Sequence, residues 1–140
     1  MMEIKQIDRD CVDVFWDKKV KNWIQSVLKQ SKGRHTLEST LRNLREGKMT
    51  MFLITINKAI TAVYIVQKVF YPAATVLGIL FCGGTKVLKH LKEIESFFIN
   101  YAKQNECDGL EIIGRKGWAK AIKQNSLNFK HTGYFYEMAT

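Results

Sequence analysis

Hydrophobic and polar positions change their period several times along the chain, and one stretch shows the change most clearly. Residues 75–81 are almost all apolar and partly β-branched, which predicts a central strand covered on both faces. Gly83 and Gly84 follow, and they allow the backbone to turn sharply or to be approached closely. Thr85 is a suitable N-cap, and beyond it apolar residues recur at spacings of four and three, namely Val87, Leu91, Ile94, Phe98 and Tyr101. The pattern therefore predicts a strand, a glycine turn and an amphipathic helix.

The start of this predicted helix carries several cations and no acid before Glu93. The cations are Lys86, Lys89, His90 and Lys92. A helix N-terminus already has partial positive charge, so acidic side chains are usually preferred there. Cations at this position are unusual, and a bound phosphate would account for them. A tight turn with solvated lysines also accounts for it, and these residues alone favour that interpretation because a lone Gly-Gly pair is a weak motif.

The N-terminal part of the chain predicts a short strand and two helices. Residues 2–7 alternate polar and apolar positions, as an edge strand does. The first helix ends near residues 31–33, and its apolar side holds Phe15, Trp16, Val20, Trp23, Ile24, Val27 and Leu28. The second helix begins at a Thr36 cap and is stopped by Gly47.

The middle of the chain predicts an antiparallel meander. Residues 49–56 and 59–70 are rich in β-forming side chains and are joined by the short turn Asn57-Lys58. A break at residues 71–73 separates the second run from the central strand. Three consecutive strands therefore pair as neighbours.

The C-terminal part predicts two more strands and one more helix. Residues 110–113 form a short strand, and residues 129–138 form the last strand. The helix between them carries Trp118, Ala121 and Ile122.

The complete order is strand, two helices, three strands, helix, strand, helix, strand. It predicts a single α/β domain over residues 1–140, with one mixed sheet of about six strands and helices on both faces. The strands at 75–81 and 110–113 are expected to be parallel, with a right-handed crossover. Ligands of such sheets bind at the carboxyl ends of strands, which places the cleft at residues 81–86.

The chain's charge favours anionic partners. The sequence has 140 residues with 22 basic and 13 acidic side chains, a net charge of +9. Its three cysteines are far apart, so neither a metal site nor a disulfide framework is expected. Such cysteine usage is typical of a reducing compartment. Residues 114–118, Gly-Arg-Lys-Gly-Trp, could contact nucleic acid with Trp118 stacked on a base, although a Trp packed against the sheet is the favoured interpretation. No apolar run is long enough to cross a membrane.

The order of elements and their total length resemble the fold of the GNAT superfamily of N-acetyltransferases. More narrowly, three stretches look like a family of small GNAT-like proteins encoded by tailed bacteriophages. They are Tyr71-Pro72, Ile79-Leu-Phe-Cys-Gly-Gly84 and Leu110-Glu-Ile-Ile-Gly-Arg-Lys-Gly-Trp118, of which Gly-Arg-Lys-Gly-Trp is the most specific.

The resemblance implies that acetyl-CoA is the cofactor and that the central strand holds it. Backbone groups of Leu80, Phe81 and Cys82 would pair with the pantetheine arm. The N–H groups of the next five residues, Gly83, Gly84, Thr85, Lys86 and Val87, would bind the pyrophosphate. The usual loop has Gln or Arg, two variable residues and then Gly-x-Gly or Gly-x-Ala, and this chain has nothing that matches the later glycine.

The resemblance also implies a base near the amine and an acid near the leaving thiolate. Tyr134 and Tyr136 lie on one face of the last predicted strand, and either could be the acid. Glu111 is the carboxylate inside the strand at 110–113 and is the base candidate. An aromatic pair covering the sheet and an exposed strand Glu are the structural alternatives, and they are the favoured ones.

Three functions stay open from the sequence. The first is an acyl-CoA-dependent N-acyltransferase that moves an acetyl group to an amine on a protein or small molecule. The second is a catalytically inactive GNAT-like phage protein that acts as a virion component or binds a host protein. The third is a nucleic-acid-binding module that uses the basic surface. The phage resemblance implies a location in the cytoplasm of an infected bacterium or in the virion.

Overall fold

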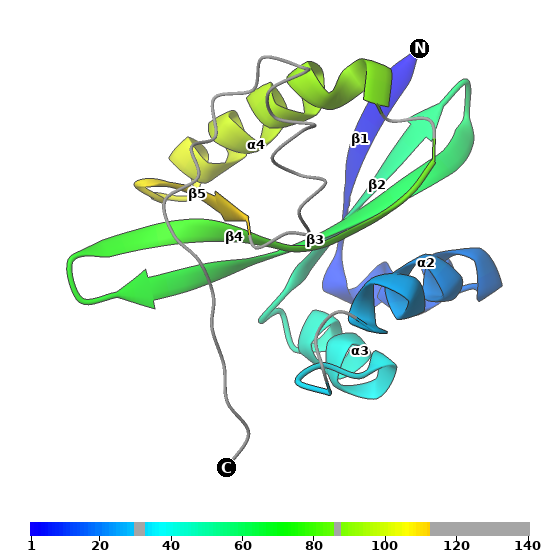
Figure 1. Ribbon diagram of the computed structural model, residues 1–140, viewed down its shortest axis with the longest axis horizontal. Helices are drawn as coiled ribbons and strands as arrows, with labels where there is room; N and C mark the ends of the chain where they lie inside the picture. The colour runs from blue at the N-terminus through cyan, green and yellow to red at the C-terminus, as the bar shows by residue number, and fades with distance from the viewer. Residues whose placement is uncertain (30–32, 86–87, 113–140) are drawn as a thin grey trace.

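The computed structural model describes residues 1–29, 33–85 and 88–112, and these form one mixed sheet with helices on both faces (Figure 1). Its elements in chain order are β1 Met2–Ile7, η1 Arg9–Cys11, α1 Val12–Phe15, α2 Lys18–Leu28, α3 Leu37–Arg45, β2 Thr50–Ile56, β3 Ala59–Tyr71, β4 Ala74–Gly84, η3 Leu88–His90, α4 Leu91–Gln104 and β5 Gly109–Ile112. The described sheet has five strands in the order β1-β2-β3-β4-β5. Neighbours are antiparallel except β4 and β5, which are parallel as expected. The α/β fold class is therefore confirmed.

Two predicted elements lie outside the described residues. They are the short helix that carries Trp118 and the last strand at residues 129–138.

The predicted first helix is two helices, so the prediction of one continuous helix was wrong. The chain leaves helical geometry at Trp16, whose ψ is 55°, and Asp17 is extended with a ψ of 177°. The Asp17 side chain then accepts a hydrogen bond from the N–H of Val20 at 2.9 Å and starts α2. A capping aspartate in the middle of an apolar stripe thus divides the helix without breaking the stripe's period.

The predicted Thr36 cap and the predicted Asn57-Lys58 turn are confirmed. Thr36 caps α3 through a capping box, in which it and Ser39 bond each other's backbone N–H groups. Asn57 and Lys58 have φ values of 51° and 70°, the left-handed pair that a two-residue hairpin favours.

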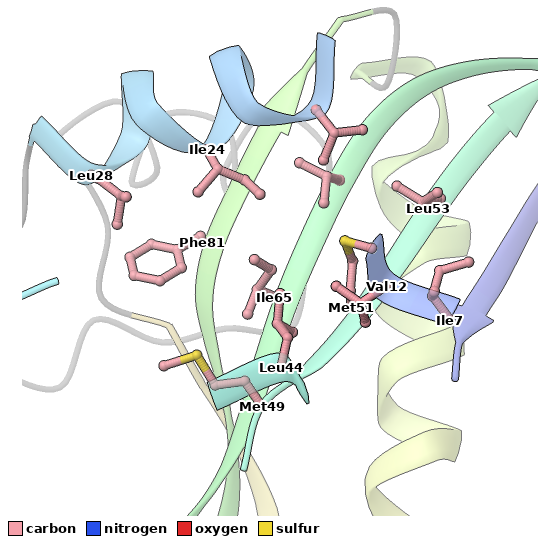
Figure 2. Close-up of a cluster of buried hydrophobic side chains, with 12 residues drawn as sticks. Ile7, Val12, Ile24, Leu28, Leu44, Met49, Met51, Leu53, Ile65 and Phe81 are labelled. Carbon is pink, nitrogen blue, oxygen red and sulfur yellow. The ribbon is translucent and has the colours of Figure 1, made fainter. Parts of the chain in front are cut away.

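The sheet separates two hydrophobic clusters, one on each face. On the α2/α3 face, Ile24 and Leu28 of α2 meet Ile65 and Phe81 of the sheet (Figure 2). On the α4 face, Phe98 of α4 is fully buried against Phe52 of β2, with ring centroids 5.1 Å apart. Both clusters include residues of β4, so that strand is covered on both sides as its composition predicted.

The Gly-Gly pair ends the strand and is not the predicted turn. Gly83 lies opposite Val63 of β3, and Gly84 lies opposite Ala62. The N–H of Thr85 donates to the carbonyl of Thr61 at 2.8 Å, which holds the chain against β3 one residue further. Thr85 is therefore not an N-cap, because α4 begins only at Leu91.

The helix itself is confirmed from Leu91 onward. Its N-cap is His90, whose side chain makes no capping bond. Leu91, Ile94 and Phe98 are buried, as the spacing predicted.

Strand β3 approaches Gly84 so closely that a residue with a side chain does not fit there. Its φ is +132°, and an added Cβ would lie 2.3 Å from the Thr61 carbonyl oxygen and 2.5 Å from the Ala62 Cα. Backbone atoms cannot move aside cheaply. A side chain at Gly84 would therefore displace β3, whether or not a ligand binds nearby.

We expect Gly84→Ala to lower the free energy of unfolding by roughly 2–4 kcal/mol, in the upper part of the range for single substitutions, because clash and backbone strain add. The matched control is Gly33→Ala, since Gly33 has a φ of +84° and open space around an added Cβ. That control isolates the strain of a positive φ, roughly 1–2 kcal/mol. Chemical denaturation measures both, and equal losses in the two variants would contradict the assigned packing.

Candidate active site

An additional residue interrupts the pairing of β4 with β3. Ile65 lies opposite Phe81, and the next residue, Val66, lies opposite Ile79. Leu80 is therefore the inserted residue of a β-bulge.

The bulge changes which side chains share a face. Ile79 belongs to the cluster on the α4 face, and Cys82 packs against the same cluster. Leu80 and Phe81 are consecutive, yet both contact the cluster on the α2/α3 face. Two neighbouring residues point the same way because the insertion cancels one step of the alternation.

The bulge follows directly after the last pair that the described residues form between β4 and β5. The parallel ladder runs from Val76 opposite Gly109 to Ile79 opposite Ile112. Beyond Ile79, β4 continues for five residues to Gly84, and no other strand of the described residues pairs with its outer edge there. An edge of this kind presents backbone N–H and C=O groups that can pair with an extended ligand. The predicted cofactor residues Leu80, Phe81 and Cys82 form the beginning of this edge.

The predicted pyrophosphate residues are positioned mainly by the protein's own packing. A Cβ on Gly83 would lie 3.1 Å from the carbonyl oxygen of Trp23 and 3.3 Å from Cγ2 of Val27, so Gly83 lets α2 approach β4 closely. Gly84 likewise lets β3 approach β4 closely. The N–H of Thr85 already donates to the carbonyl of Thr61. Lys86 and Val87 lie outside the described residues.

Glu111 lies next to the last described pair of β4 and β5. It is on β5 opposite Gly78, one position before the last pair of the parallel ladder, and its side chain is half-buried. Leu77 and Ile79 belong to the α4 face, so the intervening Gly78 looks onto the α2/α3 face.

A phenol holds the Glu111 carboxylate. The hydroxyl of Tyr71 donates to its two oxygens at 3.0 and 2.9 Å. This hydrogen bond to the carboxylate raises the pKa of Tyr71 above its ordinary value. The bond joins β3 to β5 across β4, at the position where Gly78 has no side chain.

Gly78 makes that crossing feasible. An added Cβ would lie 3.2 Å from Cγ2 of Val69 and 3.8 Å from Oε1 of Glu111. Val69 and Glu111 thus lean over Gly78 from opposite sides. The result is a small apolar surface with a carboxylate and a phenol at its border.

His35 is a candidate that the sequence analysis missed. It lies between α2 and α3, and its ring is 5.2 Å from the ring of Phe81 in an edge-to-face arrangement. A histidine in a connecting segment has no period and belongs to no motif, so only the packing of the segment onto Phe81 connects it with the bulge. His35 and Glu111 therefore border the same face of β4, one near Phe81 and the other near Gly78.

The remaining predicted site residues either lie against the core or fall outside the described residues. Tyr134 and Tyr136 lie outside the described residues. Cys82 is half-buried and lies opposite Tyr64, whose pKa is raised by burial first and then by Cys82. Tyr64 stacks on Phe98 at 5.4 Å and therefore belongs to the core.

A hollow of about 490 Å³ lies elsewhere, at the end of β1. Its lining residues are Gln6, Ile7, Asp8, Arg9, Val12, Leu44, Gly47, Met49, Thr50 and Met51, none of them from β4 or β5. Asp8 accepts the N–H of Asp10 at 3.2 Å, and Arg9 donates to the Glu46 carbonyl at 3.5 Å, so its charged groups are engaged locally.

Within residues 1–29, 33–85 and 88–112, no group of His, Cys, Asp or Glu side chains is arranged to hold a metal ion. No helix in that part of the chain is long and apolar enough to span a membrane.

Comparison with known proteins gives similarity in structure but not in sequence. No protein-family model matches the chain, and no curated protein matches its sequence.

Many solved structures share the fold at low sequence identity. An aminoglycoside acetyltransferase from an uncultured soil metagenomic sample, in complex with trehalose, has 10% identity and a TM-score of 0.67 over 99% of this chain and 97% of its own. A predicted acetyltransferase from Clostridium acetobutylicum, solved with acetyl-CoA, has 12% identity and a TM-score of 0.67 over 99% and 96%. A transcriptional regulator from Bacillus halodurans has 14% identity and a TM-score of 0.68 over the full length of both chains. The chain has the GNAT fold, and identity this low shows the fold alone.

Proposed function

We propose that this protein is an acyl-CoA-dependent N-acyltransferase that moves an acetyl group from acetyl-CoA to an amine. The observation that carries the proposal is the bulge at Leu80, beyond which no described strand pairs with the outer edge of β4. The acetyltransferase structures with the same fold support it.

The outer edge of β4 beyond Ile79 is the proposed binding site for the cofactor. The backbone of Leu80, Phe81 and Cys82 would pair with the amides of the pantetheine arm, as an added strand pairs with a sheet edge. The N–H group of Thr85 is already bonded to Thr61, so Lys86 and Lys89 are the cations proposed to attract the pyrophosphate. Bound acetyl-CoA supplies the acyl thioester.

Proton transfer is assigned to side chains around this edge. The amine nitrogen forms a bond to the thioester carbonyl carbon, the carbon–sulfur bond breaks, and the amine's proton must leave. Glu111 is the proposed acceptor of that proton, directly or through one water, and His35 is the second candidate. Tyr134 or Tyr136 remains the proposed donor to the leaving thiolate. Much of the rate would come from holding the two reactants together.

A second function has an observation in its favour. Gly83 and Gly84 are explained by the packing of α2 and β3, so they need no phosphate. This suits a non-catalytic protein with the same fold, such as a phage virion component or a protein that binds a host protein. A transcriptional regulator is among the solved structures that share this fold, and a fold alone does not determine activity.

Deleting Leu80 tests the proposal sharply. Without it, Gly78, Ile79, Phe81 and Cys82 alternate between the two faces as a regular strand does, so both clusters keep all their residues except Leu80. We expect the deletion to remove the bulge, extend the pairing of β4 with β5, and weaken acetyl-CoA binding at least tenfold, or about 1.4 kcal/mol, by calorimetry.

The matched control is Leu80→Ala, which keeps the inserted residue and its backbone groups. This variant is expected to bind acetyl-CoA within about threefold of the parent, a difference under about 0.7 kcal/mol. An equal loss in both variants would show that the side chain matters and the bulge does not. A parent protein that binds no acetyl-CoA at millimolar concentration would favour the non-catalytic function.

The two base candidates are separated by paired substitutions. With an amine that the parent acetylates, Glu111→Gln is expected to lower the rate of CoA release about 100-fold while acetyl-CoA binding stays unchanged. His35→Gln is the parallel variant, and we expect a smaller loss. The reverse ranking would transfer the role of base to His35.

A further inference from the structure

The hollow at the end of β1 has an apolar floor and a polar rim. Its volume of about 490 Å³ lies within the range of about 300–1,000 Å³ that is typical of small-molecule sites. The floor consists of buried members of the cluster on the α2/α3 face, namely Ile7, Val12, Leu44, Met49 and Met51 (Figure 2). The lining residues with polar side chains are Gln6, Asp8, Arg9 and Thr50. The hollow therefore has the make-up of a ligand site, away from the edge proposed for the cofactor.

Two consecutive residues place opposite charges on this rim. Asp8 and Arg9 both line the hollow, and within the part of the chain that the structure describes neither forms an ion pair, with the other or with a third residue. Exposed charges nearby do pair, as Glu46 does with Lys48 at 3.0 Å. Two neighbouring charges of opposite sign that are left unpaired can be satisfied together by one ligand that carries both signs.

Local contacts hold both side chains in place and leave most of their hydrogen-bonding capacity. Asp8 accepts the N–H of Asp10 at 3.2 Å with one carboxylate oxygen, Oδ1. Arg9 lies across Gly47, where an added Cβ would be 3.4 Å from its Nη1 and 3.5 Å from its Cδ. That Nη1 donates one long bond of 3.5 Å to the carbonyl of Glu46, whereas a guanidinium has five N–H donors. An arginine held in this way can present two parallel N–H groups to a carboxylate.

We propose that this hollow binds a free α-amino acid with an aliphatic side chain. Arg9 binds its carboxylate and Asp8 its ammonium group, two charges that the ligand carries on a single carbon. The aliphatic side chain lies against the floor, where Met49 and Met51 can adapt to its shape. Because exposed charges alone attract weakly, both parts are needed. The amino acid is bound here and not acetylated, since no residue of β4 or β5 lines the hollow.

A titration of the full chain with L-leucine, followed by backbone-amide NMR, tests the proposal. We expect saturable shifts at residues 6–9 and 47–51, with little change at residues 80–85. Three analogues each lack one part of the ligand: 4-methylpentanoate has no amino group, 3-methylbutylamine has no carboxylate, and glycine has no side chain. Each analogue is expected to bind at least about tenfold more weakly than leucine.

Two pairs of variants separate a local site from a general effect of net charge. Asp8→Asn and Arg9→Gln each remove one charge from the rim, and an asparagine at position 8 still caps the turn that follows. Each is expected to weaken leucine binding at least about tenfold. Asp10→Asn and Arg42→Gln remove the same charges from exposed residues that do not line the hollow, and are expected to bind leucine within about threefold of the parent. Thermal melting of each variant checks that it is folded.

The inference is overturned if millimolar L-leucine causes no shifts at residues 6–9 and 47–51. It is equally overturned if 4-methylpentanoate binds as tightly as leucine, or if Asp8→Asn and Asp10→Asn bind leucine alike. Shifts centred on residues 80–85 and 111 would place leucine in the candidate active site and contradict a separate site. Acetyl-CoA binding is measured on the same sample. Leucine binding without acetyl-CoA binding would refute the transferase and keep this site, whereas the opposite result would refute this site alone.

Discussion

One inserted residue in β4 determines how the rest of the structure can be used. Leu80 shifts the strand by one position against β3, directly after Ile79, the last residue of β4 that pairs with β5 among the described residues. The strand stays paired with β3 through Gly84 on one side, and no described strand pairs with its other edge beyond Ile79. A bulge bends and twists a strand locally, so these backbone groups are aimed differently from those of a regular strand.

This edge of β4 is packed closely against its neighbours, which is what a preformed binding edge requires. Gly83 lets α2 lie at a distance that would be tight for a Cβ, and Gly84 lets β3 lie so close that a Cβ would not fit. Phe81 anchors the same segment in the cluster beneath α2 (Figure 2). The two glycines therefore serve the ligand indirectly, by fixing the backbone that would meet it.

Much of the fold could be predicted from the sequence because it depends on periodicity. The apolar run in β4, the stripe on α4 from Leu91 onward and the turn at Asn57-Lys58 each have a local signal, and each was found where expected. The start of α4 was misplaced, because the helix begins at Leu91 and not directly after Thr85. The break before α2 was missed, since Asp17 interrupts the helix without disturbing the spacing of apolar residues.

The site was predicted less well because its features arise from tertiary contacts. Leu80 is apolar like its neighbours, so no pattern marks it as the inserted residue. The glycines were predicted to allow a sharp turn or a close approach, and the structure shows the close approach, but no sequence pattern could identify Trp23 and Thr61 as the neighbours that approach them. Glu111 was identified from its place in a strand, but its partner Tyr71 is 40 residues away in the chain and joins it only through the sheet.

The central claim is that β4 binds the cofactor along its outer edge beyond Ile79, and backbone-amide NMR tests it most directly. During a titration with CoA, the account predicts the largest shifts at residues 80–85, with little change along β1 and β2. Shifts centred instead on the hollow bordered by Ile7 and Met51, or no shifts anywhere, would contradict it.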